Sequence, residues 1–184
     1  MPISTLENVL SSAEQRAVRN RDSAVVARVS DVYAAIPSMT GKFELEYEGE
    51  IRGAENIARE LIRAAVGKTF TRYFTNVNFQ PVVQWFELGG ELKVPANASS
   101  AELLVQLKKI QGLFEHLDTL GVTQKDEAAI QASAAEFILE GLWAHKRISR
   151  SEERGFFAEA RKTPEPRDPR EPTGGGRMPR RQFN

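Results

Sequence analysis

The chain has 184 residues, of which 41% are apolar and 27% are charged, and it carries no formal net charge. This length and composition suit one globular domain with a core and exclude a chain that is disordered throughout. The absence of cysteine excludes disulfides and thiolate metal sites, and with only His116 and His145 we expect no histidine-rich metal site.

The charge is unevenly distributed along the chain. Residues 146–184 contain 11 Lys or Arg and 6 Asp or Glu, so the preceding part carries an excess of negative charge. Such a basic tail can contact nucleic acid or an acidic partner, although a solvated tail explains the same composition and is favoured. The N-terminus lacks a basic region followed by an apolar run, and no apolar stretch approaches the roughly 20 residues that span a bilayer. These features predict a cytoplasmic protein with no membrane partner.

The first part of the chain predicts two helices. Ser4 and Glu7 have the spacing of a capping box, and apolar residues then recur at helical spacing as far as Ala17. A second helix is expected over 30–39, where Pro37 ends or bends it.

Residues 43–48 change to an alternation of apolar and polar residues, which is typical of a half-buried strand. The polar face of this strand carries three carboxylates: Glu44, Glu46 and Glu48. Carboxylates at this spacing can hold a hard cation or contact a basic partner. A charged, exposed strand face that protects an edge from aggregation explains them as well and is favoured, so they are retained as a possible interface.

The middle of the chain predicts a long helix and a β-hairpin. Apolar residues recur at helical spacing over 53–74, although Gly67 interrupts them. Strand-like runs on both sides of Gly89-Gly90 predict a hairpin near 83–94, because both glycines accept positive φ. Trp85 and Phe86 belong to an aromatic-rich region that could be a docking surface, while a simple core is favoured.

The triplet Gly67-Lys68-Thr69 matches the last three residues of a phosphate-binding loop. That loop requires a glycine five residues earlier, where this chain has Ile62, and it requires a preceding strand. The triplet instead falls at the end of a predicted helix. We therefore expect no nucleotide site here, and the sequence assigns no catalytic, cofactor-binding or metal-binding residue.

Two further helices and a tail complete the chain. Ser99 and Glu102 form a second capping box that opens a helix reaching Gly121, and another helix is expected over 125–148. The sequence therefore predicts a mainly α fold: a helical, lid-like bundle over 1–150 with a small β component. A basic tail rich in Pro, Gly and Arg follows over 151–184 and is expected to be disordered.

Several long stretches of the sequence resemble one protein family. They are ISTLENVLSSAEQRAVR, RVSDVYAAIPSMTGKFELEYEGE, GAENIARELIRAAVG, QPVVQWFELGGELKV and AAEFILEGLWAHKRISRSEERG. These stretches resemble the C-terminal region of MoxR-type AAA+ ATPases that are similar to the I subunit of magnesium chelatase. The likeness extends over residues 3–155 and includes no catalytic motif.

This resemblance implies a lid and C-terminal module of a larger ATPase. In the family, an N-terminal α/β domain carries the Walker motifs, sensor 1 and the arginine finger, and none of these has a match here. Met1 falls just after the family's sensor-2 arginine, so the chain is expected to be a fragment that does not hydrolyse ATP alone. ATP and magnesium are implied for the full-length family.

The implied partners are ring-forming AAA+ subunits and a protein with a von Willebrand A-type domain. The alternative function is a free-standing interaction protein that binds nucleic acid or an acidic partner through its basic tail.

Overall fold

The computed structural model describes residues 2–41, 43, 53–93, 95, 98–151 and 153–159. Within these residues the fold is mainly helical with one small antiparallel β-hairpin, which confirms the predicted fold class. The helices are α1 (Pro2–Asn20), α2 (Val29–Ala34), α3 (Ile36–Thr40), α5 (Ala54–Tyr73), α6 (Gln80–Glu87), α7 (Ser100–Leu107) and α8 (Ala128–Ala144). Two 3₁₀ turns, η1 (Phe114–His116) and η2 (Asp118–Leu120), precede α8, and the strands β1 (Ile148–Ser151) and β2 (Gly155–Ala158) follow it.

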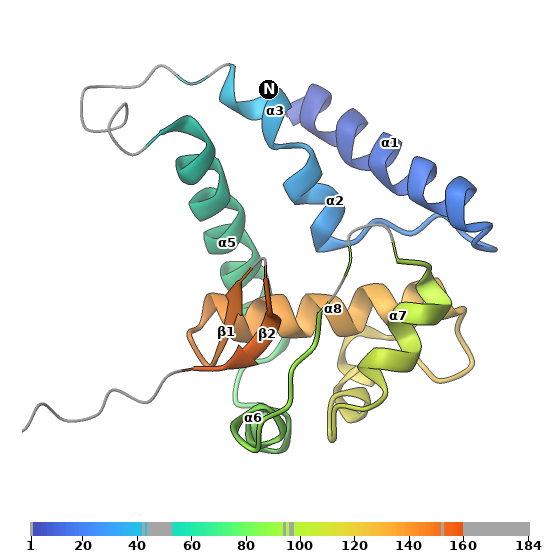
Figure 1. Ribbon diagram of the computed structural model, residues 1–184, viewed down its shortest axis with the longest axis vertical. Coiled ribbons are helices and arrows are strands. Elements are labelled where there is room, and N and C mark those ends of the chain that lie inside the picture. The colour runs from blue at the N-terminus through green and yellow to red at the C-terminus, as the bar shows by residue number, and fades with distance from the viewer. Residues whose placement is uncertain are drawn as a thin grey trace, which may run out of the picture.

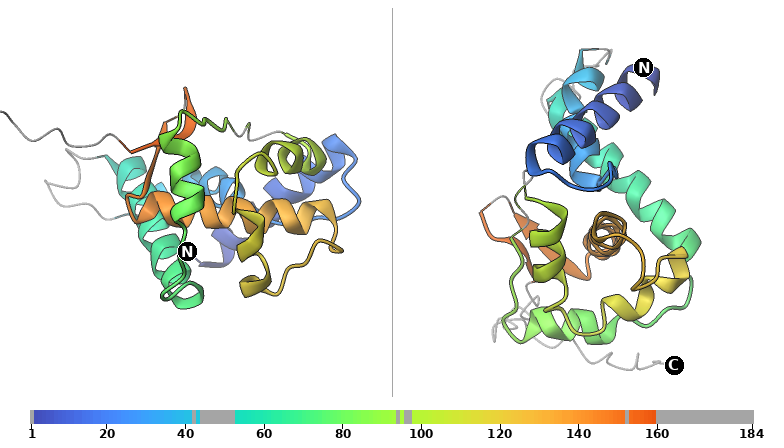
Figure 2. Two further views of the ribbon diagram at one scale, coloured as in Figure 1. Left: turned by 90° about the horizontal axis from the view of Figure 1, so that it is seen from below. Right: turned by 90° about the vertical axis from the view of Figure 1, so that its right-hand side faces the viewer.

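Helix α8 forms the centre of the fold. It is apolar on nearly every side, and α5, α6, α7 and the hairpin surround it, as the end-on view in Figure 2 shows. A helix of this kind is stable only when other elements cover it, because its whole surface must be removed from water. Its fully buried apolar side chains are Ala132, Ala135, Ile138, Leu139 and Leu142.

The crossing of α5 and α8 depends on two glycines. A Cβ added to Gly67 would lie 3.2 Å from the Cβ of Ala144. A Cβ added to Gly141 would lie 2.1 Å from Cδ2 of Phe70, so the Phe70 ring packs directly on the backbone of α8. The two helices therefore approach each other closely because Gly67 makes room for Ala144 and Gly141 makes room for the Phe70 ring.

Helices α1, α2 and α3 form an outer layer above this body (Figure 1). Helix α1 packs on α2 and α3, while α2 and α3 contact α8 and α5 below them. A second, small apolar cluster joins the layer to the first half of α5 and consists of Ile36, Ala58 and Ile62 with half-buried neighbours. The helix predicted over 30–39 is thus divided into α2 and α3, with Pro37 in the first turn of α3.

Two predicted helix starts have different outcomes. Ser99 is the N-cap of α7, its hydroxyl accepts a hydrogen bond from the Glu102 backbone N–H, and the Glu102 carboxylate accepts one in return, so this capping box is confirmed. Helix α1 begins at Pro2, which places Ser4 and Glu7 inside it. The first capping box is therefore wrong.

The hairpin predicted near 83–94 is also wrong. Residues 80–87 form α6, whose buried side chains Val82 and Phe86 recur at helical spacing. Pro81 lies in the first turn, where a missing N–H is tolerated. Gly89-Gly90 ends the helix: the Trp85 ring packs over Gly90, where an added Cβ would lie 2.3 Å from Cε3 of that ring. Leu92 then forms an isolated antiparallel bridge with Phe156.

The hairpin of this protein lies instead at the end of the described chain. Strands β1 and β2 pair antiparallel, with Arg150 opposite Phe156 and Ser151 opposite Gly155. Gly155 has φ 74°, and an added Cβ would lie 2.1 Å from the Leu92 carbonyl oxygen, so the close approach of β2 to the backbone at Leu92 requires glycine. Ordered structure therefore continues to residue 159, past the predicted boundary at residue 150.

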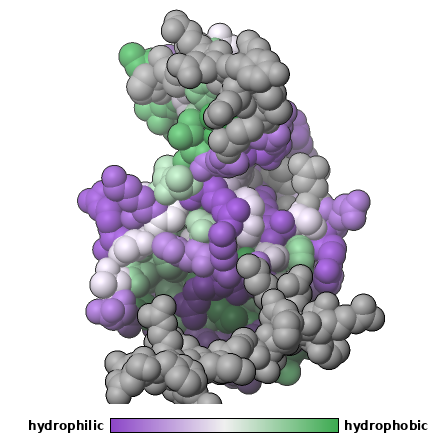
Figure 3. Space-filling view, turned by 90° about the vertical axis from the view of Figure 1, so that its left-hand side faces the viewer, coloured by the Kyte–Doolittle hydropathy of each residue, from purple (hydrophilic) through white to green (hydrophobic). Residues whose placement is uncertain are grey.

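The strand predicted over 43–48 lies outside the described residues except for Phe43, and residues 160–184 also lie outside them. Among the described residues, no helix combines the length and apolar content needed to cross a membrane. The face that includes α5 and the C-terminal end of α8 is mostly hydrophilic across its middle (Figure 3).

Candidate functional site

The predicted interface residues do not come together in the described structure. Glu44, Glu46 and Glu48 lie outside the described residues. Phe86 is only 1% exposed and belongs to the main core, and Trp85 is half-buried and meets the Phe86 ring edge-on with 5.0 Å between centroids. This pair therefore serves mainly as core, with part of the Trp85 ring left accessible.

The triplet Gly67-Lys68-Thr69 lies within α5 and forms no loop. The Thr69 hydroxyl donates a hydrogen bond to the Ala65 carbonyl, one helical turn earlier. Its backbone N–H groups belong to the helix, so they cannot converge on a phosphate in the way a glycine-rich loop requires. The interpretation of the triplet as part of a helix is confirmed.

The outer face of α1 carries an apolar stripe that nothing in the described structure covers. Ile3, Leu6 and Leu10 are 74%, 58% and 49% exposed and lie at spacings of three and four residues, so they share one side of the helix. Ala13 and Ala17 lie seven residues after Leu6 and Leu10, on nearly the same side of the helix, and both are buried. The apolar side of α1 is therefore exposed in its N-terminal half and buried in its C-terminal half, where Arg16 is buried as well.

A network of buried charges attaches the C-terminal half of α1 to α2. Arg16 is 5% exposed and donates a hydrogen bond of 2.8 Å from Nη2 to Oδ2 of Asp31, near the start of α2. The same Nη2 lies 2.7 Å from the Val26 carbonyl oxygen, and the Ser12 hydroxyl donates to Oδ1 of Asp31. Arginine suits such a site because its guanidinium presents several donors in fixed directions.

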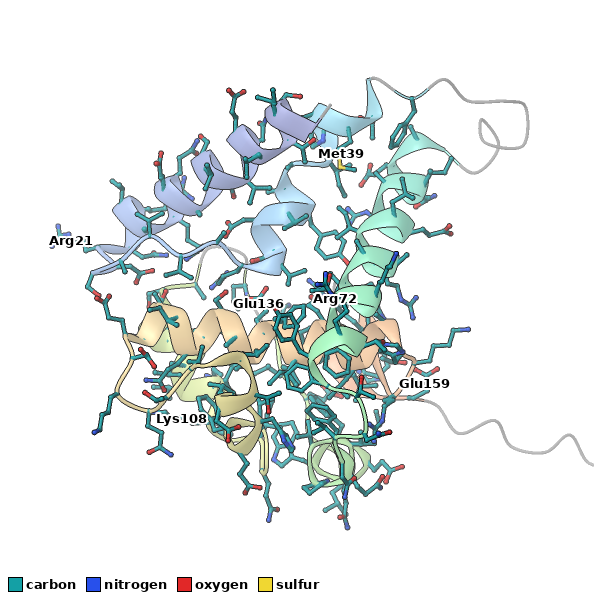
Figure 4. The ribbon with its side chains drawn as sticks, turned by 180° about the vertical axis from the view of Figure 1, so that it is seen from behind. Arg21, Met39, Arg72, Lys108, Glu136 and Glu159 are labelled. Carbon is teal, nitrogen blue, oxygen red and sulfur yellow. The ribbon has the colours of Figure 1, made fainter. Side chains whose placement is uncertain are left out.

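The network continues from the outer layer into the body. Arg28 is 2% exposed, and its Nε lies 3.2 Å from Oε2 of Glu136 on α8. The Ser30 backbone N–H donates to Oε1 of Glu136, and Figure 4 shows Glu136 where α8 faces α2. Burial lowers the pKa of Arg28, and the charge of Glu136 opposes that shift.

The loop after α1 extends the network to α7. The Asp22 carboxylate accepts hydrogen bonds from the backbone N–H and the hydroxyl of Ser100, in the first turn of α7. A carboxylate at a helix N-terminus satisfies free N–H groups and is favoured by the helix dipole. Charged residues thus connect α1, α2, α7 and α8.

A second buried cluster lies where α2, α8 and the hairpin meet. The Glu140 carboxyl on α8 is 1% exposed and pairs with Arg150 of β1. Burial raises the pKa of Glu140 to about 7, opposed by the charges of Arg150 and Arg63 and reinforced by that of Glu136. Oε2 of Glu140 and the hydroxyl of Tyr33 have no hydrogen-bond partner among the described residues.

Tyr33 completes this cluster from α2. Burial raises the pKa of its hydroxyl above the usual value, and the negative charge of Glu140 raises it further. The Arg150 guanidinium lies 5.4 Å from the Tyr33 ring centroid. The cluster binds hairpin, α2 and α8 together, and its carboxyl group can change protonation near neutral pH.

The described residues contain no group of three or more His, Asp or Glu side chains that could hold a metal ion. His116 packs against the Phe79 ring with 4.4 Å between centroids. Nε2 of His145 lies 3.1 Å from the Gly67 carbonyl oxygen. Within this part of the chain, both histidines have structural contacts.

Sequence reasoning missed the buried charges, although a signal for two of them exists. Glu136 and Glu140 are the only charged residues within the sequence of α8, and a carboxylate in so apolar a helix needs a buried partner. Their partners Arg28 and Arg150 lie outside α8, so no local sequence pattern connects either carboxylate with its arginine.

Comparison with protein-family models, curated proteins and solved structures yields no match to this chain.

Proposed function

We propose that this chain is a helical module of a magnesium-chelatase-like, MoxR-type AAA+ ATPase, and that it acts in subunit assembly and partner contact. The observation that supports this role best is the uncovered apolar stripe of Ile3, Leu6 and Leu10 on α1. A contiguous exposed apolar surface of this kind usually marks a site of protein–protein contact. The mainly helical architecture and the extended sequence resemblance agree with the role.

The proposed occupant of the stripe is a different surface of a second copy of the chain. Glu7 and Glu14 are exposed and follow one edge of the stripe. Two α1 helices placed side by side would bring these carboxylates together, and like charges in contact are unfavourable. A head-to-tail contact avoids this repulsion, and contacts of that type form a ring when the rotation between successive subunits closes.

Sedimentation velocity over a range of protein concentrations tests this proposal. We expect the wild-type chain to associate as its concentration rises and the double variant Leu6→Asp/Leu10→Asp to remain monomeric. Val105→Asp is the matched control, because Val105 is 61% exposed on α7 and lies outside the stripe. A wild-type chain that stays monomeric, or a double variant that associates like the control, would contradict the proposed contact.

Isothermal titration calorimetry with ATP tests whether this chain binds the nucleotide by itself. In this proposal, ATP and magnesium belong to another domain of the ATPase, so the chain alone is expected to show no heat of ATP binding. A micromolar Kd for ATP would contradict it.

A partner with a von Willebrand A-type domain belongs to the proposal through the resemblance alone. The nucleic-acid alternative depends on residues 163–184, which lie outside the described residues, and stays a prediction.

A further inference from the structure

A hollow of about 390 Å³ lies between α5 and the C-terminal end of α8. Its floor is formed by small residues, Ala64, Gly67 and Ala144, which meet where the two helices cross closely. Three cations line it: Arg63 and Lys68 from α5, and Lys146 from the turn that follows α8. It is distinct from the apolar stripe of α1, which belongs to the outer layer.

The positive charge of this hollow is only partly neutralised. Glu60 is the one carboxylate in the lining, against three cations. Lys68 and Lys146 are exposed, and neither ammonium group forms an ion pair with another described residue. Two unpaired ammonium groups beside an apolar floor form a surface that is complementary to carboxylates carried on short apolar stems.

Two further lining residues are held in fixed positions. Nη2 of Arg63 donates a 2.9 Å hydrogen bond to the Trp143 carbonyl, and its guanidinium lies 4.5 Å from the Trp143 ring centroid. The His145 ring is held through Nε2, which lies 3.1 Å from the Thr71 hydroxyl oxygen. The hollow therefore exists before a ligand arrives, which reduces the entropy lost on binding.

The backbone at Lys146 is a separate indication of function. Helix α8 ends in a Schellman motif, in which Lys146 N–H donates to the Trp143 carbonyl and Arg147 N–H donates to the Leu142 carbonyl. Lys146 occupies the left-handed position of this motif with φ 57°, where glycine is strongly preferred. A lysine in this position costs stability and places an ammonium group at the hollow.

We propose that this hollow binds an acidic peptide segment of a partner protein. A nucleic acid fits it less well, because the His145 imidazole is the one aromatic ring among the described lining residues and its Nε2 lies against the Gly67 carbonyl and the Thr71 hydroxyl, so bases would find little surface for stacking. The ligand would place one or two carboxylates between Lys68, Lys146 and Arg63 while its short side chains cover the floor.

Fluorescence anisotropy with a fluorescein-labelled peptide of alternating glutamate and alanine tests the site on the full chain. We expect saturable binding that weakens with added salt and by at least about fivefold in Lys68→Gln/Lys146→Gln. Ala64→Phe should weaken binding to a similar extent without a change in charge, because Ala64 is exposed on the floor. Lys125→Gln, which removes an exposed lysine elsewhere, should change the affinity less than about twofold.

Lys146→Gly separates a binding role from a structural one. Relief of the left-handed strain should raise the thermal midpoint by about 3 °C, while the loss of the ammonium group weakens peptide binding. A variant that is more stable and still binds the peptide with wild-type affinity would overturn the role of Lys146. Circular dichroism confirms that each variant is folded.

Three results would overturn the proposal as a whole. The first is equal peptide affinity in Lys68→Gln/Lys146→Gln and Lys125→Gln. The second is tighter binding of a single-stranded oligonucleotide, with loss in the same variants, which would make the hollow a nucleic-acid site. The third is displacement of the peptide by submillimolar inorganic phosphate, which would make it a site for small anions. None of these results depends on whether α1 mediates self-association.

Discussion

The outer layer of α1, α2 and α3 and the body around α8 are held together in different ways. The body has a continuous apolar core to which α5, α6, α7, α8 and the hairpin all contribute. The layer shares only a small apolar cluster with α5, and much of its remaining attachment consists of buried hydrogen bonds and ion pairs through Asp31, Arg28 and Glu136.

This difference affects what each region can do. Apolar burial is non-directional, so the relative positions of the helices in the body are set by the close packing of their side chains. Buried ion pairs are directional and cost desolvation, so they add little net stability but strongly favour one relative placement of the layer. The apolar side chains that α1 does not use for packing, Ile3, Leu6 and Leu10, remain available for a partner.

Breaking the ion pair between Arg28 and Glu136 should have the largest effect. Arg28→Ala leaves the Glu136 carboxylate buried without its cation, and we expect the free energy of unfolding to fall by about 3–5 kcal/mol in chemical denaturation. The double variant Arg28→Met/Glu136→Gln removes both charges and should recover a large part of that loss. If the single and double variants are equally unstable, then side-chain packing rather than charge determines how much the contact between Arg28 and Glu136 stabilises the fold.

Glu140 should make the stability of the body depend on pH. Its pKa is raised from 4.5 to about 7 in the folded state, so its contribution is fully present below the unfolded value and is lost as pH rises through 7. Between about pH 5 and 8 the wild-type free energy of unfolding should fall by up to about 3 kcal/mol relative to Glu140→Gln. The groups that face the carboxyl are Arg150 from β1, Glu136 from α8, Arg63 from α5 and Tyr33 from α2.

Urea denaturation of both proteins at several pH values measures this difference. Comparison with Glu140→Gln cancels the contribution of other titrating groups, including Asp126, whose pKa is lowered by hydrogen bonds from the Thr123 backbone and hydroxyl. Parallel pH profiles for the two proteins would contradict the assignment to Glu140.

The sequence predicted individual helices better than their packing. Helix α5 and the start of α7 follow from periodicity and from the Ser99–Glu102 capping box, because these are local signals. The hairpin near 83–94 was wrong because Val83 to Leu88 alternate enough to resemble a strand. The equally present helical spacing of Phe79, Val82 and Phe86 decides the structure once the core forms.

The way in which the helices pack against one another could largely not be predicted from one sequence. The apolar pattern of α1 predicts that Leu6 and Leu10 are buried, yet within the described structure only the C-terminal part of this pattern, at Ala13 and Ala17, is covered. The hollow beside Lys68 could not be predicted, since it depends on two helices crossing at Gly67 and Ala144.

Two glycine substitutions test the packing of α5 on α8 within the body and should have the smallest effects on stability. Gly141→Ala places a methyl group where the Phe70 ring lies, 2.1 Å from its Cδ2, and should destabilise the body by about 1–3 kcal/mol. Gly67→Ala meets only the Ala144 methyl at 3.2 Å, and the better helix propensity of alanine, worth up to about 1 kcal/mol, opposes that contact.

We therefore expect Gly67→Ala to change the free energy of unfolding by less than about 1 kcal/mol, as measured by urea denaturation. Both glycines lie in helices at the same crossing, so the pair separates steric packing from backbone propensity. Equal effects of the two substitutions would show that α5 and α8 can shift apart at little cost. The close crossing would then not be the feature that fixes the shape of the hollow beside Lys68.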